Sequence, residues 1–237
     1  MLTSPQNSAA DVHVGLARTR ERLAAAARAA GRDAGSVTLL AVSKQQGAAA
    51  VRAAAEAGHR DFGENYVQEA VAKMDALADL DLVWHFIGQL QSNKTRVVAE
   101  YFQWVHTVDR ERIARRLSEQ RPYHAPPLQV CLQVNLDRET AKGGVSPEET
   151  LDLAARVVEL PRLRLRGLMC IPAPRETFEE QHAVFARLTA LLAQLKAAGF
   201  DLDTLSMGMS ADLEAAVAAG ATIVRIGTAI FGERPKP

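Results

Sequence analysis

Short runs of β-branched and other apolar residues alternate along the chain with longer segments rich in alanine, leucine, glutamate and arginine. The short runs are typical of strands and the longer segments of helices. A leading helix is predicted over residues 12–30, or about 10–31 at most, because this stretch lacks proline and Gly31 follows it. Eight strands are predicted after it, at residues 37–42, 59–62, 82–87, 104–108, 128–135, 165–169, 204–206 and 222–226.

The order of these elements predicts the fold class. Strands separated by helices pair in parallel, because a parallel crossover needs about a dozen residues. Eight such units predict closure into an α/β fold of the (β/α)8 TIM-barrel type, with residues 1–237 forming one domain behind the extra N-terminal helix. The alternative is an open doubly wound sheet. Its dinucleotide fingerprint is absent after the first strand, at residues 43–47, which favours the barrel.

Capping signals support the predicted helix boundaries. Residues 146–149 read Ser-Pro-Glu-Glu, which predicts a capping box at a helix start. Gly58, Gly199 and Gly220 each follow an alanine-rich run and precede a strand, as glycines at helix ends do.

Composition removes several function classes. The formal net charge is zero, so the chain lacks the basic excess of nucleic-acid-binding proteins. Arg162, Arg164 and Arg166 alternate with leucines and are interpreted as one solvated strand face rather than a phosphate patch. Cys131 and Cys170 lie far apart and show neither metal-ligand nor disulfide-framework spacing. Without a signal sequence or a membrane-spanning apolar run, a cytoplasmic protein with no metal site is expected.

The first candidate for chemistry is Lys44. The active site of a (β/α)8 barrel lies at the C-terminal ends of its strands, and Lys44 follows the first strand. Strand alternation puts it in phase with Leu40 and Val42, so it points into the barrel mouth if these two residues fill the interior. Apolar surroundings favour a neutral amine, the form that attacks an aldehyde. The alternative is a surface lysine that ends a strand.

The last two strands predict a phosphate site. Arg225 lies inside the β-branched eighth strand, where it must be paired, either in an internal salt bridge such as one to Glu64 or with a ligand. Gly227 and Thr228 offer backbone N–H groups and a hydroxyl where barrels frequently bind phosphate. Ser210, after the seventh strand, is predicted to cap a helix and to face the same anion.

The roles of two other polar residues, Asn65 and His85, stay open at this point. Asn65, after the second strand, could cap the next helix or contact a ligand. His85 could act as a base, although a core histidine is favoured.

The segments that contain these candidate residues together resemble those of the pyridoxal phosphate homeostasis protein family, small proteins that bind pyridoxal 5′-phosphate (PLP). The resemblance covers nearly the whole chain after the leading helix. It is carried by residues 40–44 (Leu-Ala-Val-Ser-Lys), 62–69 (Phe-Gly-Glu-Asn-Tyr-Val-Gln-Glu), 84–88 (Trp-His-Phe-Ile-Gly), 90–94 (Leu-Gln-Ser-Asn-Lys), 167–172, 206–210 (Ser-Met-Gly-Met-Ser) and 224–232 (Val-Arg-Ile-Gly-Thr-Ala-Ile-Phe-Gly).

The resemblance implies a fold similar to the alanine racemase barrel domain and a role for each candidate. By that resemblance Lys44 forms a Schiff base with PLP, and Arg225 approaches the pyridine nitrogen. The remaining cofactor-binding residues are Ser210, Gly227 and Thr228 at the phosphate, Asn65 beside the cofactor and Met207 near the ring.

The chain departs from the family at the lysine segment. Many relatives read Ser-Lys-Thr-Lys-Pro there, whereas Gln46 stands here in place of the second lysine. A secondary PLP contact at that position is therefore in doubt. Lys142 is a weaker candidate for one.

The resemblance implies a non-catalytic PLP carrier that serves intracellular PLP homeostasis. A small PLP-dependent racemase is the alternative, and a sugar-phosphate barrel enzyme without PLP is a third possibility. Racemases of this fold take their second base from an additional β-domain, and we expect none here because only a short segment follows the predicted eighth strand. The expected partners are PLP and apo forms of PLP-dependent enzymes, with no nucleic acid or membrane, and the protein is expected to be a monomer or weak dimer.

Overall fold

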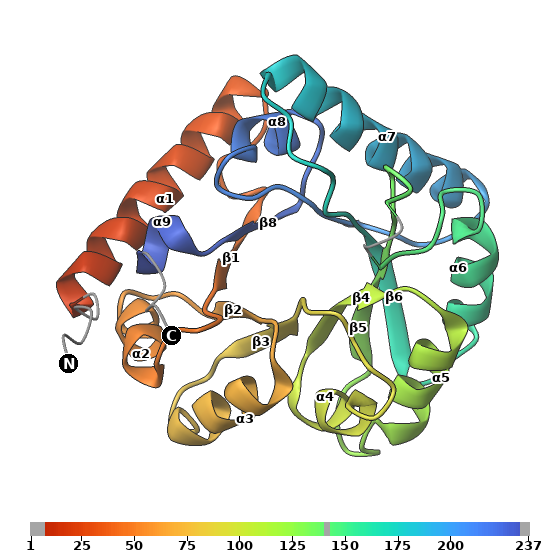
Figure 1. Ribbon diagram of the computed structural model, residues 1–237, viewed down its shortest axis with the longest axis horizontal. Coiled ribbons are helices and arrows are strands. Elements are labelled where there is room, and N and C mark those ends of the chain that lie inside the picture. The colour runs from red at the N-terminus through yellow and green to blue at the C-terminus, as the bar shows by residue number, and fades with distance from the viewer. Residues whose placement is uncertain (1–7, 140–142, 233–237) are drawn as a thin grey trace.

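Eight parallel strands close into a barrel in the order of the sequence (Figure 1). The structure is a computed structural model that describes residues 8–139 and 143–232. The first strand pairs with the last as well as with the second, so the sheet has no edge. The predicted (β/α)8 barrel is confirmed, and the doubly wound alternative is wrong. The strands are β1 (Thr38–Val42), β2 (Asp61–Glu64), β3 (Val83–Phe86), β4 (Trp104–Val108), β5 (Leu128–Gln133), β6 (Leu163–Met169), β7 (Thr204–Ser206) and β8 (Ile223–Ile226).

Helices surround the barrel, and the first of them precedes its first strand (Figure 1). This helix, α1, begins with a capping box between Ser8 and Asp11 and ends before Gly31, close to the predicted leading helix. It lies along α9, the short helix after the last strand (Figure 1). The helices are α1 (Ala9–Ala29), α2 (Ala48–Glu56), α3 (Val67–Ala76), α4 (Thr95–Tyr101), α5 (Glu111–Gln120), α6 (Thr150–Val158), α7 (Phe178–Ala197), α8 (Leu213–Ala218) and α9 (Thr228–Phe231).

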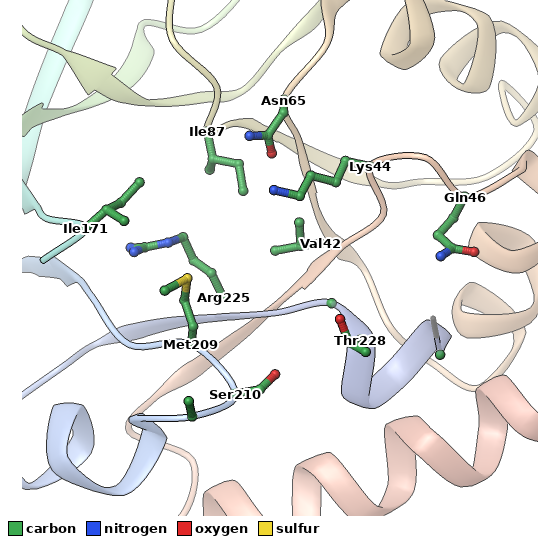
Figure 2. A pocket seen from close by; sticks show the side chains of 13 residues that line it. Val42, Lys44, Gln46, Asn65, Ile87, Ile171, Met209, Ser210, Arg225 and Thr228 are labelled. Atoms are coloured by element: carbon green, nitrogen blue, oxygen red, sulfur yellow. The ribbon is translucent and has the colours of Figure 1, made fainter. Parts of the chain in front are cut away.

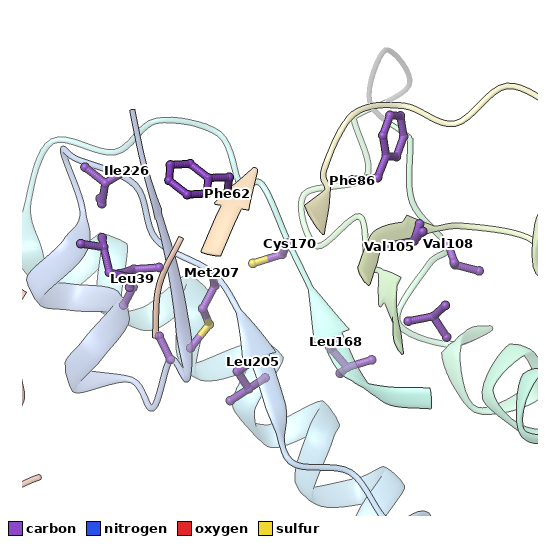
Figure 3. Packing of buried hydrophobic residues seen from close by; sticks show 14 of the residues in the cluster. Leu39, Phe62, Phe86, Val105, Val108, Leu168, Cys170, Leu205, Met207 and Ile226 are labelled. Atoms are coloured by element: carbon purple, nitrogen blue, oxygen red, sulfur yellow. The ribbon is translucent and has the colours of Figure 1, made fainter. Parts of the chain in front are cut away.

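Strand alternation divides the apolar residues into two cores. Leu40, Val42, Ile87 and Ile223 form a small cluster inside the barrel. The larger cluster lies between the strands and the helices and includes Leu39, the neighbour of Leu40 on the opposite face of β1 (Figure 3). The assignment of Leu40 and Val42 to the barrel interior, on which the orientation of Lys44 depended, is thereby confirmed.

The element boundaries differ from the sequence predictions at a few places. β2 begins at Asp61 rather than at residue 59, because its pairing with β3 begins at Asp61 and Val83. Only one of the two capping-box hydrogen bonds forms at Ser146: the Glu149 N–H donates to the Ser146 hydroxyl, which itself donates to the Glu149 carboxylate. These bonds close a turn ahead of α6, which begins at Thr150. Gly58, Gly199 and Gly220 have φ values of 77°, 97° and 102° at helix ends, as predicted.

The three arginines at β6 do not form one solvated face, because they differ in exposure. Arg164 is exposed, whereas Arg166 is half-buried in a bidentate ion pair with Asp203. Arg162 donates to the backbone carbonyl of Pro122. These partners are protein groups, so the preference against a phosphate patch agrees with the contacts.

The remaining composition-based expectations concern cysteines, metals and membranes. Cys131 and Cys170 are free thiols, and burial raises the pKa of each to about 12. Within residues 8–139 and 143–232, no three histidine, cysteine or acidic side chains gather as they would around a metal ion. No helix in the same residues is both long and apolar enough to cross a bilayer.

Candidate functional site

A pocket of about 300 Å³ opens where β1, β2, β3, β7 and β8 end (Figure 2). This is the C-terminal side of the barrel, where the sequence places its candidates. Six of the seven predicted site residues line the pocket, and Met207 does not. The lining residues are Val42, Lys44, Gln46, Asn65, Ile87, Ile171, Met209, Ser210, Ala211, Arg225, Gly227, Thr228 and Gly232.

Lys44 extends its amine from the end of β1 into the pocket (Figure 2). Val42 and Ile87 lie beside it, so apolar side chains border the amine as the strand phase predicts. The surface-lysine alternative is therefore wrong. An amine so placed can react with an aldehyde that enters the pocket.

A buried ionic cluster holds the segment that carries Lys44. Lys73 of α3 donates to the backbone carbonyl of Ser43 at 2.6 Å, to Glu64 at 2.7 Å and to Glu69 at 2.6 Å. Ser43 also donates to Glu64, and the backbone N–H of Gln45 donates to Glu69. Gln45 has a left-handed φ of 61°, so these bonds fix a strained turn directly after Lys44.

Burial dominates the electrostatics of this cluster. It raises the pKa of Glu64, although the Lys73 ammonium and the Ser43 hydroxyl act in the opposite direction. One carboxylate oxygen of Glu64 is buried with no hydrogen-bond partner among the described residues. This cluster was not predictable from the sequence, because Glu64 lies on a strand and Lys73 on the next helix, and no common periodicity links the two residues.

Arg225 lies in the barrel at the base of the pocket, and the residue is 5% exposed. It donates to Ser206 Oγ at 2.8 Å and to the Cys170 carbonyl at 2.9 Å. The alternative of a salt bridge to Glu64 is wrong, because Glu64 is paired with Lys73. Burial lowers the pKa of Arg225.

The predicted phosphate residues lie together on one side of the pocket. The hydroxyls of Ser210 and Thr228 point into the same space from the ends of β7 and β8 (Figure 2). Gly227 precedes α9, and a Cβ there would lie 3.0 Å from the Val42 carbonyl oxygen, so a larger residue would fit tightly between β8 and β1. Ser210 is not the helix cap that the sequence predicts, because α8 begins after Asp212.

Asn65 is a pocket residue rather than a helix cap. The residue at the N-cap of α3 is Tyr66, and the Asn65 Oδ1 atom is buried without a hydrogen-bond partner among the described residues. Gly88 packs against its backbone, where a Cβ would lie 2.2 Å from the Asn65 carbonyl oxygen. A buried acceptor with no protein donor favours the ligand-contact interpretation.

Met207 and His85 lie away from the pocket lining. Met207 is fully buried in the outer core near Leu205, on the face of the chain opposite to Ser206 (Figure 3). The methionine at the pocket is Met209. His85 is buried inside the barrel beside His106, as the core interpretation predicts. Lys142 lies outside the described residues.

The pocket thus brings together one amine, one buried guanidinium and two hydroxyls beside backbone N–H groups. These groups suit a small ligand with a carbonyl carbon and an anionic group.

A family model described as "Alanine racemase, N-terminal domain" matches residues 14–235. A pyridoxal phosphate homeostasis protein of Pseudomonas aeruginosa is 62% identical over 219 residues, which are 92% of this chain and 94% of that protein.

This chain belongs to the pyridoxal phosphate homeostasis protein family. The protein of that name from Escherichia coli is 53% identical over 227 residues, covering 94% of this chain and 97% of its own. PipY of Synechococcus elongatus, solved with PLP bound, is 39% identical with a TM-score of 0.82, covering 93% of this chain and all of PipY. An alanine racemase of Streptomyces coelicolor is 20% identical, with a TM-score of 0.73 over 94% of this chain and 58% of that one, and this likeness concerns the fold alone. The resemblance stated from the sequence is confirmed.

Proposed function

We propose that this protein binds PLP in the pocket, holds it as a Schiff base on Lys44, and serves PLP homeostasis as a carrier without significant turnover of amino acids. Its curated relatives are named for PLP homeostasis, and PipY has been solved with PLP. The observation that carries the proposal is the convergence of Lys44, Arg225 and the Ser210 and Thr228 hydroxyls on one pocket.

The pocket residues fit the cofactor group by group. The Lys44 amine suits the aldehyde, which it can bind with loss of water. Ser210, Thr228 and the N–H groups after Gly227 suit the phosphate dianion, and the unpaired oxygen of Asn65 suits a donor on the bound molecule.

Arg225 makes the racemase alternative depend on well-placed bases on both faces of the substrate Cα. When bound, the pyridine ring of PLP supplies an electron sink for reactions at an amino-acid Cα. A guanidinium opposite the ring nitrogen disfavours a proton there and so weakens that sink. The proposed partners are apo forms of PLP-dependent enzymes that accept the cofactor, and the proposed setting is the cytoplasm, as a monomer or weak dimer.

The site of attachment tests the proposal. Protein incubated with PLP and reduced with borohydride should carry the pyridoxyl group on Lys44, and peptide mass mapping locates it. Lys94→Ala is the matched control and should be labelled like the wild type, because Lys94 does not line the pocket. Labelling mainly at Lys94 or Lys142, or labelling of Lys44→Ala to the wild-type extent, would contradict the assignment.

A further inference from the structure

A row of polar side chains crosses the barrel interior below the pocket. His85 Nε2 lies 3.2 Å from Asp61 Oδ1, and His85 Nδ1 lies 2.9 Å from His106 Nε2. His106 Nδ1 lies 2.8 Å from Ser206 Oγ, which accepts from Arg225 at 2.8 Å. We call these five residues the interior chain. It runs from Asp61, at the start of β2, to Arg225, at the pocket, through three side chains that are nearly inaccessible to solvent.

The two charged ends favour one direction for the hydrogen bonds between them. A guanidinium only donates, so Ser206 Oγ accepts from Arg225 and can pass its own proton to His106 Nδ1. His106 then donates from Nε2 to His85 Nδ1, and His85 donates from Nε2 to the Asp61 carboxylate. The reverse order would turn a lone pair of His85 toward that carboxylate and leave the Ser206 proton without its acceptor in the chain.

Both imidazoles in this arrangement are neutral and carry their proton on Nε2. Burial lowers the pKa of His85, although Asp61 acts in the opposite direction. Burial also lowers the pKa of His106 strongly, and repulsion from His85 and Arg225 adds to the effect. Trp104 stacks on the His85 ring at 5.4 Å and is itself covered by Arg166, which is paired with Asp203.

The interior chain also bears on the buried charge of Arg225. No carboxylate forms an ion pair with Arg225 among residues 8–139 and 143–232, and its other bond is to the Cys170 carbonyl. A buried cation without a counter-ion is costly unless aligned dipoles compensate it. Hydrogen bonds that all point from Arg225 toward Asp61 provide such alignment, because each donor polarises the next.

We propose that the interior chain positions Arg225, holding its guanidinium toward the bound ligand through one-way hydrogen bonds that end at Asp61. This inference rests on the proposed function, because the ligand that Arg225 meets is PLP. Ser206, His106 and His85 are then positioning residues that act through Arg225.

The histidine tautomers test the direction of the hydrogen bonds in the interior chain, and they can be measured in protein to which no cofactor has been added. Nitrogen NMR of ¹⁵N-histidine-labelled protein at about pH 7 should show His85 and His106 as neutral Nε2–H tautomers. Asp61→Asn replaces the carboxylate with a group that can also donate, so Nδ1–H forms should appear in that variant. Nδ1–H or doubly protonated rings in the wild type, or tautomers unchanged in Asp61→Asn, would overturn the proposed direction.

The hydroxyl at the centre of the chain tests positioning. Ser206→Ala removes one Arg225 contact and should raise the dissociation constant of PLP by about fivefold and shift its absorption band. Thr204→Val is the matched control, because Thr204 is a buried β7 hydroxyl that bonds to Asp203 outside the chain. It should behave as wild type.

The two failures are distinguishable. If the wild type binds PLP and Ser206→Ala matches Thr204→Val in affinity and spectrum, the positioning role is wrong while the proposed function stands. If the wild type takes up no PLP, the proposed function and the positioning role are both wrong. The tautomers then test only the direction of the hydrogen bonds in the interior chain.

Discussion

Ser210 and Thr228 contribute one hydroxyl each to the same side of the pocket, from two different strand ends (Figure 2). Neither residue is distinctive by itself, since a serine or threonine after a strand commonly caps a helix. Their significance comes from the parallel pairing of β7 with β8, which brings the C-terminal ends of these two strands together. The hydroxyls are therefore available to an anion that also meets the first N–H groups of α9.

Removing one of these hydroxyls should weaken PLP binding. Ser210→Ala or Thr228→Val should raise the dissociation constant by roughly tenfold or more, because a hydrogen bond to a charged group contributes about 1.5–3 kcal/mol. Equilibrium titration followed by absorbance measures the change. Pyridoxal, which lacks the phosphate, should bind far more weakly than PLP to the wild type and should lose little further in the variants. Equal affinity of the wild type for pyridoxal and PLP would contradict a phosphate site here.

The residues that the sequence could predict are those whose position follows from strand phase. Lys44 and Arg225 are in phase with interior residues of β1 and β8, and both line the pocket. Met207 was assigned to the ring by the resemblance and not by strand phase, and it lies in the outer core instead. Gly208 has a φ of 93°, and Met209 beyond it lines the pocket. The contacts of Lys73 were not predictable, because they depend on how α3 packs against β2.

At the scale of elements, α1 contacts both segments that form the proposed phosphate site, the one with Ser210 and the one with α9. Its Arg22 donates to the Ser210 carbonyl at 2.8 Å and forms a bidentate ion pair with Glu214 of α8. Its Gly15 lies so close to α9 that a Cβ would be 2.6 Å from the Ile230 carbonyl oxygen. The alanine-rich pattern predicts that this helix exists, but its docking depends on a glycine that packs against Ile230 and on an arginine whose partners are about 190 residues away.

Loosening this contact should speed the release of PLP. Arg22→Ala should raise the dissociation rate by about two- to fivefold, a modest effect because the ion pair with Glu214 is partly exposed. Transfer of PLP to an excess of an apo-enzyme, or to a carbonyl trap, gives the rate. Arg18→Ala is the control, since Arg18 is exposed on the same helix and does not contact Ser210. If PLP dissociates at the same rate from the two variants, the contact between Arg22 of α1 and the Ser210 carbonyl does not hold the phosphate site.

The whole molecule combines a barrel interior that holds both a small apolar cluster and the interior chain with a pocket that has few ionisable groups. Closure into a barrel was predictable from eight alternating strand and helix units, because each amphipathic element needs a partner layer. The interior chain was not, since Asp61, His85 and His106 become neighbours only when three strands pair in one register. Within the described ranges 8–139 and 143–232, 13 residues line the pocket, and Lys44 and Arg225 are the ionisable side chains among them.

This shortage of proton-transfer groups predicts little turnover of amino acids. Racemisation requires one group to remove the Cα proton and another to return a proton on the opposite face. Lys44 can serve one face, but Arg225 stays protonated and cannot act as the second base. Holo-protein incubated with L-alanine in deuterium oxide should therefore show slow Cα deuteration and negligible D-alanine by chiral chromatography. Lys44→Ala supplies the background rate, and rapid deuteration with D-isomer formation that disappears in this variant would support a racemase instead of a carrier.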